Sequence, residues 1–165
     1  YDLTVICGEQ RLKSNKALLA SSSWVFRRML ETDMTEKMKD EINIKDATPE
    51  IIEDLLDFLA NGLIPKDFDS KAVEMIHWAE KSKLETLIVA CENSLINNLS
   101  VDNVINTLIN VDLYLPKSEH RQKILDFINS NAAEVIKSND WMKFIQNYPK
   151  LVTELYMAAT AGMAK

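Results

Sequence analysis

The 165-residue sequence has few of the residues that interrupt helices, with only three glycines and four prolines. Repeats of short strands, glycine-rich phosphate loops and flexible linkers all need more of these residues, so the composition argues against them. No apolar run approaches the ~20 residues that a membrane-spanning helix requires, and no charged-then-apolar leader opens the chain. The sequence therefore predicts a mainly helical protein, with neither membrane insertion nor secretion indicated.

Cysteine and basic residues are also scarce. Cys7 and Cys91 lie in apolar segments without the C-x-x-C spacing of a zinc ribbon, so neither a metal site nor a disulfide framework is expected. A reducing compartment, the cytoplasm or the nucleus, is the simpler inference. Lys and Arg number 19 against 25 Asp and Glu, which gives a net charge of −6. Because phosphate binding relies on clustered Lys and Arg, nucleic acid is not an expected partner.

The first part of the chain carries clear strand signals. Leu3–Cys7 is a β-prone run, and Gly8 tolerates the positive φ of a tight turn before residues 10–13 resume extended character. Residues 41–45 alternate polar and apolar side chains at period two, which is the pattern of a half-buried strand. We therefore expect a hairpin and a third strand that together form a small sheet.

Two short helices are expected between the hairpin and the third strand. Residues 15–19 and 24–30 are rich in apolar side chains, and the three serines between them can cap the second helix. Residues 31–40 are polar and charged apart from Met34 and Met38, so they predict an exposed loop. Two methionines on an exposed loop therefore need an explanation.

From Thr48 onward the sequence indicates helices. Thr48-Pro49-Glu50 supplies a capping hydroxyl, a proline suited to the first helical position and an acid near the helix N-terminus, and Gly62 ends this helix. Ser100 or Asp102 is expected to cap a later helix. The clearest apolar stripe, at offsets typical of a helix, consists of Leu84, Leu87, Ile88, Cys91 and Leu95. Further helices are predicted around residues 73–79, 101–108, 124–128, 141–145 and 149–159.

The order of these elements predicts two parts. An α+β unit covers residues 1–98, and an α-helical extension covers residues 99–165, with a polar break at Asn97-Asn98-Leu99-Ser100 between them. A chain of this length buries enough surface to fold without a metal or a disulfide.

No arrangement of residues indicates a catalytic, cofactor or metal site. His77 and His120 have no second His or Cys at the i+3 or i+4 spacing of a helix-borne metal pair. A Cys–His nucleophile made from Cys7 or Cys91 with His77 stays open, because such pairs meet in space and not in sequence. Both cysteines fit apolar packing positions, however, where a thiol stays protonated and inert. The sequence therefore favours binding over catalysis, with no cofactor.

The N-terminal run of residues resembles the opening of a BTB/POZ domain. The segment D-L-T-V-I-C-G-E-Q-R-L-K-S-N-K-A-L-L-A-S-S-S-W-V-F-R-R-M-L is similar to the family pattern D-V-x-L-x-V, a hairpin, then A-H-K-x-x-L-A-x-x-S-x-x-F-x-x-M. The likeness continues through E-I-N-I-K-D-A-T-P-E-I-I-E-D-L-L-D-F-L-A-N-G and A-E-K-S-K-L-E-T-L-I-V-A-C-E-N-S-L. The later segments S-V-D-N-V-I-N-T-L-I-N-V-D-L-Y and D-F-I-N-S-N-A-A-E-V-I-K-S-N-D-W resemble the helical 3-box and the start of a BACK region. The matching residues at the start are Asp2, Val5, Lys16, Leu19, Ala20, Ser23, Phe26 and Met29.

This resemblance implies an α+β BTB/POZ fold, in which helices cap a small sheet, followed by a helical 3-box and a partial BACK region. The subgroup that the chain resembles is the MATH–BTB adaptors, because a short helical tail follows and no kelch repeat begins. Such proteins are non-catalytic adaptors that join a substrate protein to a cullin-3 ubiquitin ligase. The chain starts abruptly at Tyr1, so the substrate-binding MATH domain is expected upstream of it.

The resemblance also implies a cullin-binding site. In cullin-binding members a hydrophobic–x–Glu element lies between the second helix and the next strand, and Met34-Thr35-Glu36 stands at that position. A polarizable methionine can fill a partner's pocket, while Glu36 can cap a helix or pair with a basic group. The alternative is that Met34 packs onto its own domain. Residues 101–133, the 3-box helices, are expected to enlarge a docking groove for the N-terminal segment of cullin-3.

Self-association is the other implied interaction. Dimerisation is expected through Leu18, Leu19 and their neighbours, and a further self-contact through Tyr156 on the last helix, for which burial within one chain is the alternative. Asn15 replaces the family's usual His, and Ala60-Asn61-Gly62 replaces Tyr-Thr-Gly, so the contacts of those side chains are not carried over. A second interpretation is a BTB dimer that acts as a scaffold or corepressor platform without binding cullin-3.

Overall fold

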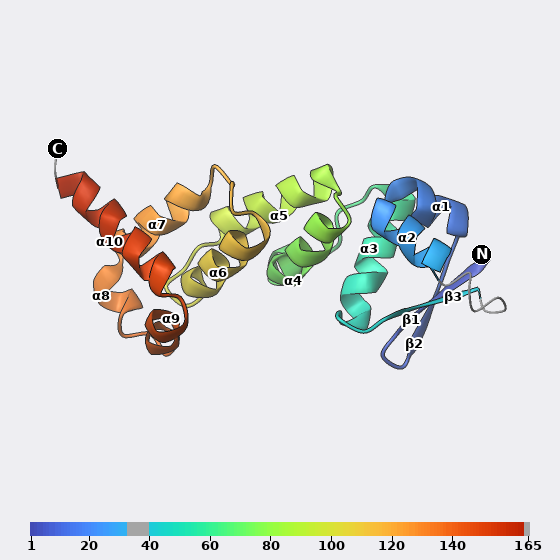
Figure 1. Ribbon diagram of the computed structural model, residues 1–165, viewed down its shortest axis with the longest axis horizontal. Coiled ribbons are helices and arrows are strands. Elements are labelled where there is room, and N and C mark those ends of the chain that lie inside the picture. The colour runs from blue at the N-terminus through green and yellow to red at the C-terminus, as the bar shows by residue number, and fades with distance from the viewer. Residues whose placement is uncertain (33–39, 164–165) are drawn as a thin grey trace. The chain divides into compact units, whose positions relative to one another are not determined.

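The protein forms two compact units, Tyr1–Cys91 (unit 1) and Glu92–Lys165 (unit 2), in a computed structural model that describes residues 1–32 and 40–163 (Figure 1). Unit 1 contains the strands as well as helices, whereas every regular element in the described part of unit 2 is helical. The α+β class with a helical extension, predicted from the sequence, is confirmed. The predicted domain boundary at residue 98 stays a prediction.

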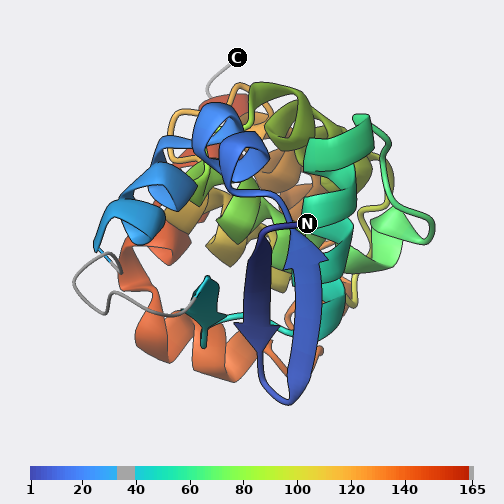
Figure 2. The same cartoon turned by 90° about the vertical axis from the view of Figure 1, so that its right-hand side faces the viewer.

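The sheet of unit 1 has three strands in the order β2-β1-β3. Strand β1 (Leu3–Cys7) pairs antiparallel with β2 (Gln10–Ser14) and parallel with β3 (Glu41–Ile44), and Figure 2 shows the hairpin of the first two strands at the lower edge of the view. Gly8 has a φ of 60° in the hairpin turn, where L side chains are disfavoured. The predicted hairpin and third strand are therefore confirmed.

Helices complete the core of unit 1. The elements are α1 (Lys16–Ser22), α2 (Trp24–Thr32), α3 (Pro49–Asn61), α4 (Phe68–Lys81) and the first part of α5 (Glu85–Asn97). Of these helices, α3 packs against β2. At the centre, the Phe26 and Trp78 rings stack with centroids 6.5 Å apart, and both side chains are buried. The predicted stripe on α5 is confirmed, since Leu87, Ile88, Cys91 and Leu95 are buried and Leu84 is half-buried.

The predicted helix caps are only partly correct. The Thr48 side chain makes no capping bond, and Ser23 Oγ is buried without a hydrogen-bond partner, while the hydroxyls of Ser21 and Ser22 donate backwards to the carbonyl of Leu18. These caps were wrong because Ser, Thr and Asn side chains have several local backbone partners and tertiary packing selects among them. Asn15, instead, accepts the N–H of Leu18 and caps α1.

Unit 2 is an assembly of short helices. It contains the end of α5, then α6 (Val104–Tyr114), α7 (Arg121–Ser130), α8 (Ala132–Val135), α9 (Trp141–Asn147) and α10 (Pro149–Met163). The cap predicted at Ser100 or Asp102 was wrong, because the N-cap of α6 is Asn103, whose side chain makes no capping bond. Ser100 Oγ accepts the N–H of Asn103, and Asn103 Oδ1 accepts the N–H of Ser100, in the turn that precedes the helix. The predicted start of this helix near Val101 was early, because residues 101–103 form a turn. The buried apolar core includes Val104, Ile105, Leu108, Val111, Ile124, Leu125, Ile128, Val135, Phe144, Leu151 and Leu155.

None of the helices in the described part of the chain is long and apolar enough to cross a bilayer.

Candidate protein-interaction surfaces

The predicted cullin-binding element, Met34-Thr35-Glu36, lies outside the described residues. The structure describes both sides of it: α2 ends at Thr32, and Asp40 leads into β3. The carbonyl of Asp40 accepts the N–H of Thr4 at 2.7 Å. The segment that carries the element therefore connects two elements that are fixed in unit 1.

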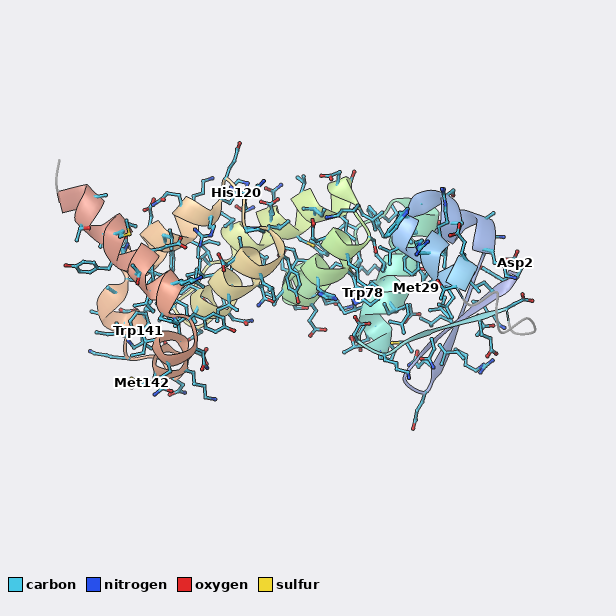
Figure 3. All side chains as sticks on the ribbon, viewed as in Figure 1. Asp2, Met29, Trp78, His120, Trp141 and Met142 are labelled. Carbon is cyan, nitrogen blue, oxygen red and sulfur yellow. The ribbon has the colours of Figure 1, made fainter. Side chains whose placement is uncertain are left out.

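Polar contacts hold the start of α1, where the dimerisation residues were predicted. Asp2 Oδ1 accepts the backbone N–H of Lys16 at 2.8 Å, and Lys16 Nζ forms an ion pair with Asp40; Figure 3 labels Asp2 beside this end of unit 1. The hydrogen bond to Asp40 raises the pKa of Lys16 above its ordinary value. Asp2, Lys16 and Asp40 thus tie the N-terminus, α1 and the approach to β3 together.

The two leucines predicted for dimerisation have different surroundings. Leu19 is fully buried in the core of unit 1, whereas Leu18 is half-buried. Only Leu18 therefore has side-chain surface left for a partner, and Leu19 can contribute by fixing the position of α1. Their role in dimerisation stays a prediction.

Tyr156 lies on the solvent side of α10. Its side chain is 71% exposed, and the neighbouring Met157 is 63% exposed, while Leu151 and Leu155 anchor the opposite side of the helix. The alternative in which Tyr156 is buried within its own chain therefore does not hold. An exposed aromatic beside a methionine provides apolar area for a protein contact.

An arginine fastens α10 to the rest of unit 2. Arg121 Nη1 donates to Glu154 of α10 at 2.5 Å, and its Nη2 donates to Asp112 of α6 at 2.7 Å. These bonds, first to Glu154 and then to Asp112, outweigh burial and raise the pKa of Arg121 above its ordinary value. Asn129 adds a hydrogen bond to the carbonyl of Leu155 at 3.3 Å. The surface of α10 is therefore presented on a fixed helix.

A groove between α6 and α9 was not predicted from the sequence. It encloses about 480 Å³. Its apolar floor includes Ile105, Ile109, Phe144 and Tyr148, and its polar rim is formed by Asp102, Asn103, Asn106, Asp140, Lys143 and Asn147. The ring of Phe144 packs against the rings of Trp141 and Tyr148, with centroids 5.6 and 6.0 Å away. Figure 3 labels Trp141 and Met142 at the start of α9. The apolar residues recur at i and i+4 on each helix, but only the fold shows that the two helices face each other.

The thiols have the properties of packed side chains. Cys7 Sγ donates to the carbonyl of Ala47 at 3.2 Å, and burial, with the charge of Asp46, raises the pKa of Cys7 above its ordinary value. Cys91 is also buried, and neither cysteine forms a disulfide. A thiol that stays protonated is a poor nucleophile, so this environment does not favour the Cys–His alternative.

His77 lies near a charged cluster that fastens the loop after β3. His77 Nε2 is 3.6 Å from Asp46 Oδ2, and Lys81 Nζ is 3.0 Å from the same atom and 4.3 Å from the centre of the Trp78 ring. Burial alone would raise the pKa of Asp46, but the hydrogen bond and charge of Lys81 outweigh it and lower this pKa. Within residues 1–32 and 40–163, no group of three or more potential ligands is placed to hold a metal ion.

Comparison with known proteins identifies the class. Residues 1–99 match the family model of the BTB/POZ domain, so the chain belongs to the BTB/POZ family. The BTB domain of zebrafish PATZ1 shares the fold, with a TM-score of 0.50 and 21% sequence identity over 59% of this chain and 76% of that one. BTB/POZ domains are protein-interaction modules that self-associate and bind protein partners, and as a class they are not catalytic.

Two mouse proteins are similar over nearly the whole chain. TD and POZ domain-containing protein 4 of Mus musculus is 34% identical over 157 residues, which is 94% of this chain and 42% of that protein. TD and POZ domain-containing protein 2 of the same species is 35% identical over 164 residues, 99% of this chain and 45% of that protein. The similarity therefore extends through unit 2, and the chain spans less than half the length of these relatives.

Proposed function

We propose that this chain is the BTB part of a substrate adaptor for a cullin-3 RING ubiquitin ligase. The order of the parts supports the proposal: the BTB/POZ match over residues 1–99 is followed by a helical unit with its own core. The sequence Met34-Thr35-Glu36 also follows α2, where cullin-binding relatives carry a hydrophobic–x–Glu element. In this role the chain catalyses no reaction and holds substrate and ligase together.

The first contact in this proposal is made by the connection between α2 and β3. Met34 fills an apolar pocket of the cullin-3 N-terminal domain, for which an unbranched, polarizable side chain is well suited. Glu36 pairs with a basic group at the edge of that pocket. Truncating such a central anchor typically costs at least ~2 kcal/mol of binding free energy, which is about a thirty-fold loss of affinity.

The second contact lies on unit 2. The N-terminal segment of cullin-3 runs along the 3-box helices within residues 101–133, and the groove between α6 and α9 offers it an apolar floor on α6. The amides of Asn106 and Asn147 at the rim can each donate and accept, which suits the main chain of an extended segment. Docking of an apolar segment here would bury Ile109, which is half-buried in the unbound chain.

Self-association gives the adaptor two copies of each site. In the proposal, Leu18 and the α1 surface form a homodimer contact, and Tyr156 on α10 forms a second one. Two separate self-contacts on one chain allow assembly beyond a dimer if the contacts do not close on each other. The substrate is bound by a MATH domain upstream of Tyr1, and the adaptor works in the cytoplasm, the nucleus or both.

The proposal is tested by titrating the purified chain with the cullin-3 N-terminal domain. We expect a dissociation constant in the nanomolar to micromolar range, and a loss of about thirty-fold or more for the double variant Met34→Ala, Glu36→Lys. Met38→Ala is the matched control from the same segment and should bind as the parent does. Unchanged affinity of a folded double variant would show that this element is not the contact.

The groove has its own matched pair of variants on α6. Ile109→Arg places a charged side chain in the floor and should weaken cullin-3 binding by about ten-fold. Leu113→Arg, on the same helix but outside the groove lining, replaces a side chain that is already 64% exposed and should have little effect. Equal affinities of the two variants for cullin-3 would show that the groove does not bind cullin-3.

The scaffold interpretation gives a different outcome. A BTB dimer without a cullin-3 function would elute alone from a sizing column in the presence of the cullin-3 N-terminal domain, yet would keep its own dimeric size. The BTB/POZ match supports self-association in either case.

A further inference from the structure

The connection between α3 and α4 exposes two adjacent large apolar side chains. Leu63 is 68% exposed and Ile64 is 43% exposed. Figure 2 shows this connection on the right of the view, where it leaves the end of α3 and runs along the outside of the unit. Single exposed apolar residues are common on protein surfaces, but two neighbours on one short loop offer a contiguous contact.

The backbone of this loop, residues 62–67, is fixed at both ends. Gly62 adopts a φ of 68° and donates to the carbonyl of Phe58 at 2.7 Å, which ends α3. Asp67 also has a positive φ of 55°, and its carbonyl accepts both the N–H and the hydroxyl of Ser70. A preformed loop loses little conformational entropy on binding, so its exposed side chains can be used efficiently.

The charge around this loop is strongly negative. Residues 50–71 contain six acidic and two basic side chains. Of the two basic residues, Lys71 is paired with Asp54 at 2.7 Å, and Lys66 lies in the loop itself. Asp67 and Asp69 line a shallow hollow of about 520 Å³ next to the loop, and Asp57 lies on the exposed side of α3 before it. An anionic partner such as a nucleic acid or an acidic lipid surface would therefore be repelled.

We propose that the 62–67 loop is a docking site for a partner-protein segment in which apolar residues are flanked by Lys or Arg. The apolar residues of the segment cover Leu63 and Ile64, and its basic residues face Asp57, Asp67 and Asp69. This site goes beyond the proposed cullin-3 function and uses none of the residues assigned to it. The carboxylates set the on-rate and the specificity, whereas the apolar pair supplies most of the affinity.

The test uses a fluorescein-labelled peptide, Arg-Arg-Leu-Leu-Arg-Arg, titrated with the intact chain and followed by fluorescence polarisation. The Arg-Arg-Ser-Ser-Arg-Arg and Glu-Glu-Leu-Leu-Glu-Glu peptides separate the apolar and the electrostatic contributions. The proposal expects saturable binding of the first peptide, at least about ten-fold weaker binding of the serine peptide and none of the glutamate peptide. Absence of binding of the first peptide, or equal binding of the serine peptide, overturns the proposal.

Variants of the chain locate the binding. The double variant Leu63→Ser, Ile64→Ser should bind the Arg-Arg-Leu-Leu-Arg-Arg peptide about ten-fold more weakly. The matched control, Leu113→Ser with Ile136→Ser, changes two side chains of similar exposure, 64% and 52%, in unit 2. This control should bind the peptide with unchanged affinity. Asp67→Asn with Asp69→Asn should weaken binding about three-fold or more at low salt and flatten its salt dependence; asparagine tolerates the left-handed backbone at position 67.

Two results would contradict this assignment. Binding that is unchanged in the Leu63, Ile64 variant would place the peptide elsewhere on the chain. Self-association of the parent chain that the same variant abolishes would show that a second copy, and not a basic segment, covers the loop. Sedimentation of both proteins over a range of concentrations measures this directly.

Discussion

Arg121 is predicted to hold α10, the helix that carries Tyr156, in place. It is only 17% exposed and makes one charged hydrogen bond to Glu154 and one to Asp112, whose own side chains are 42% and 38% exposed. Exposed ion pairs contribute about 0.2–1 kcal/mol each, whereas hydrogen bonds to charged groups contribute about 1.5–3 kcal/mol when buried. For half-exposed carboxylates we expect about 1 kcal/mol per contact. Because only Glu154 lies on α10, Arg121→Met should destabilise the docking of α10 by about 1 kcal/mol.

The assay is amide hydrogen exchange followed by mass spectrometry on peptides from residues 149–163. A loss of about 1 kcal/mol makes local opening about five times more frequent, and amide exchange in α10 should accelerate by about the same factor. Arg121→Lys keeps one of the two contacts and should give an intermediate rate. Lys123→Met, an exposed residue on the same helix without a charged partner, is the control. Exchange in the Arg121→Met variant at the rate of this control would show that Arg121 does not hold α10.

Three further predictions concern the thiols, the acid limit of stability and the last helix. Cys7, whose pKa is raised, should react with iodoacetamide much more slowly than free cysteine at neutral pH; rapid alkylation of the native protein would reopen the catalytic alternative. The pKa of Asp46 is lower in the folded chain than its ordinary value of 3.8. The ionised carboxylate therefore stabilises the fold above pH 3.8, and this stabilisation is lost as the pH falls below that value. Asp46→Asn should make the free energy of unfolding less dependent on pH in acid, which circular dichroism can measure. Tyr156→Lys should weaken self-association in sedimentation velocity, whereas Met142→Lys, at an exposed site on α9, should not.

Local periodicity explains why much of the fold could be predicted. The alternation in Glu41–Ile44 places Ile42 and Ile44 in the core, and the α5 stripe places Leu87 and Cys91 there, because both patterns follow directly from strand and helix geometry. The four-residue helix α8 is too short to show a helical period, and sequence reasoning missed it.

The candidate interaction surfaces were less predictable because they depend on tertiary packing. Leu18 and Leu19 are neighbours in one helix, so they point about 100° apart, and sequence alone does not show which one enters the core. The groove joins α6 to α9, and nothing local to either helix encodes that pairing. Tyr156 follows Leu155 on an apolar helix, and only the fold shows that Leu155 is buried while Tyr156 is exposed.

The most direct test of the proposed function is the affinity of the chain for the cullin-3 N-terminal domain, measured by titration calorimetry. We expect a complex with a dissociation constant at or below the micromolar range, and an affinity about thirty-fold lower when Met34→Ala and Glu36→Lys are combined. A folded, self-associating parent chain that does not bind cullin-3 would contradict the adaptor function and leave a BTB/POZ interaction scaffold.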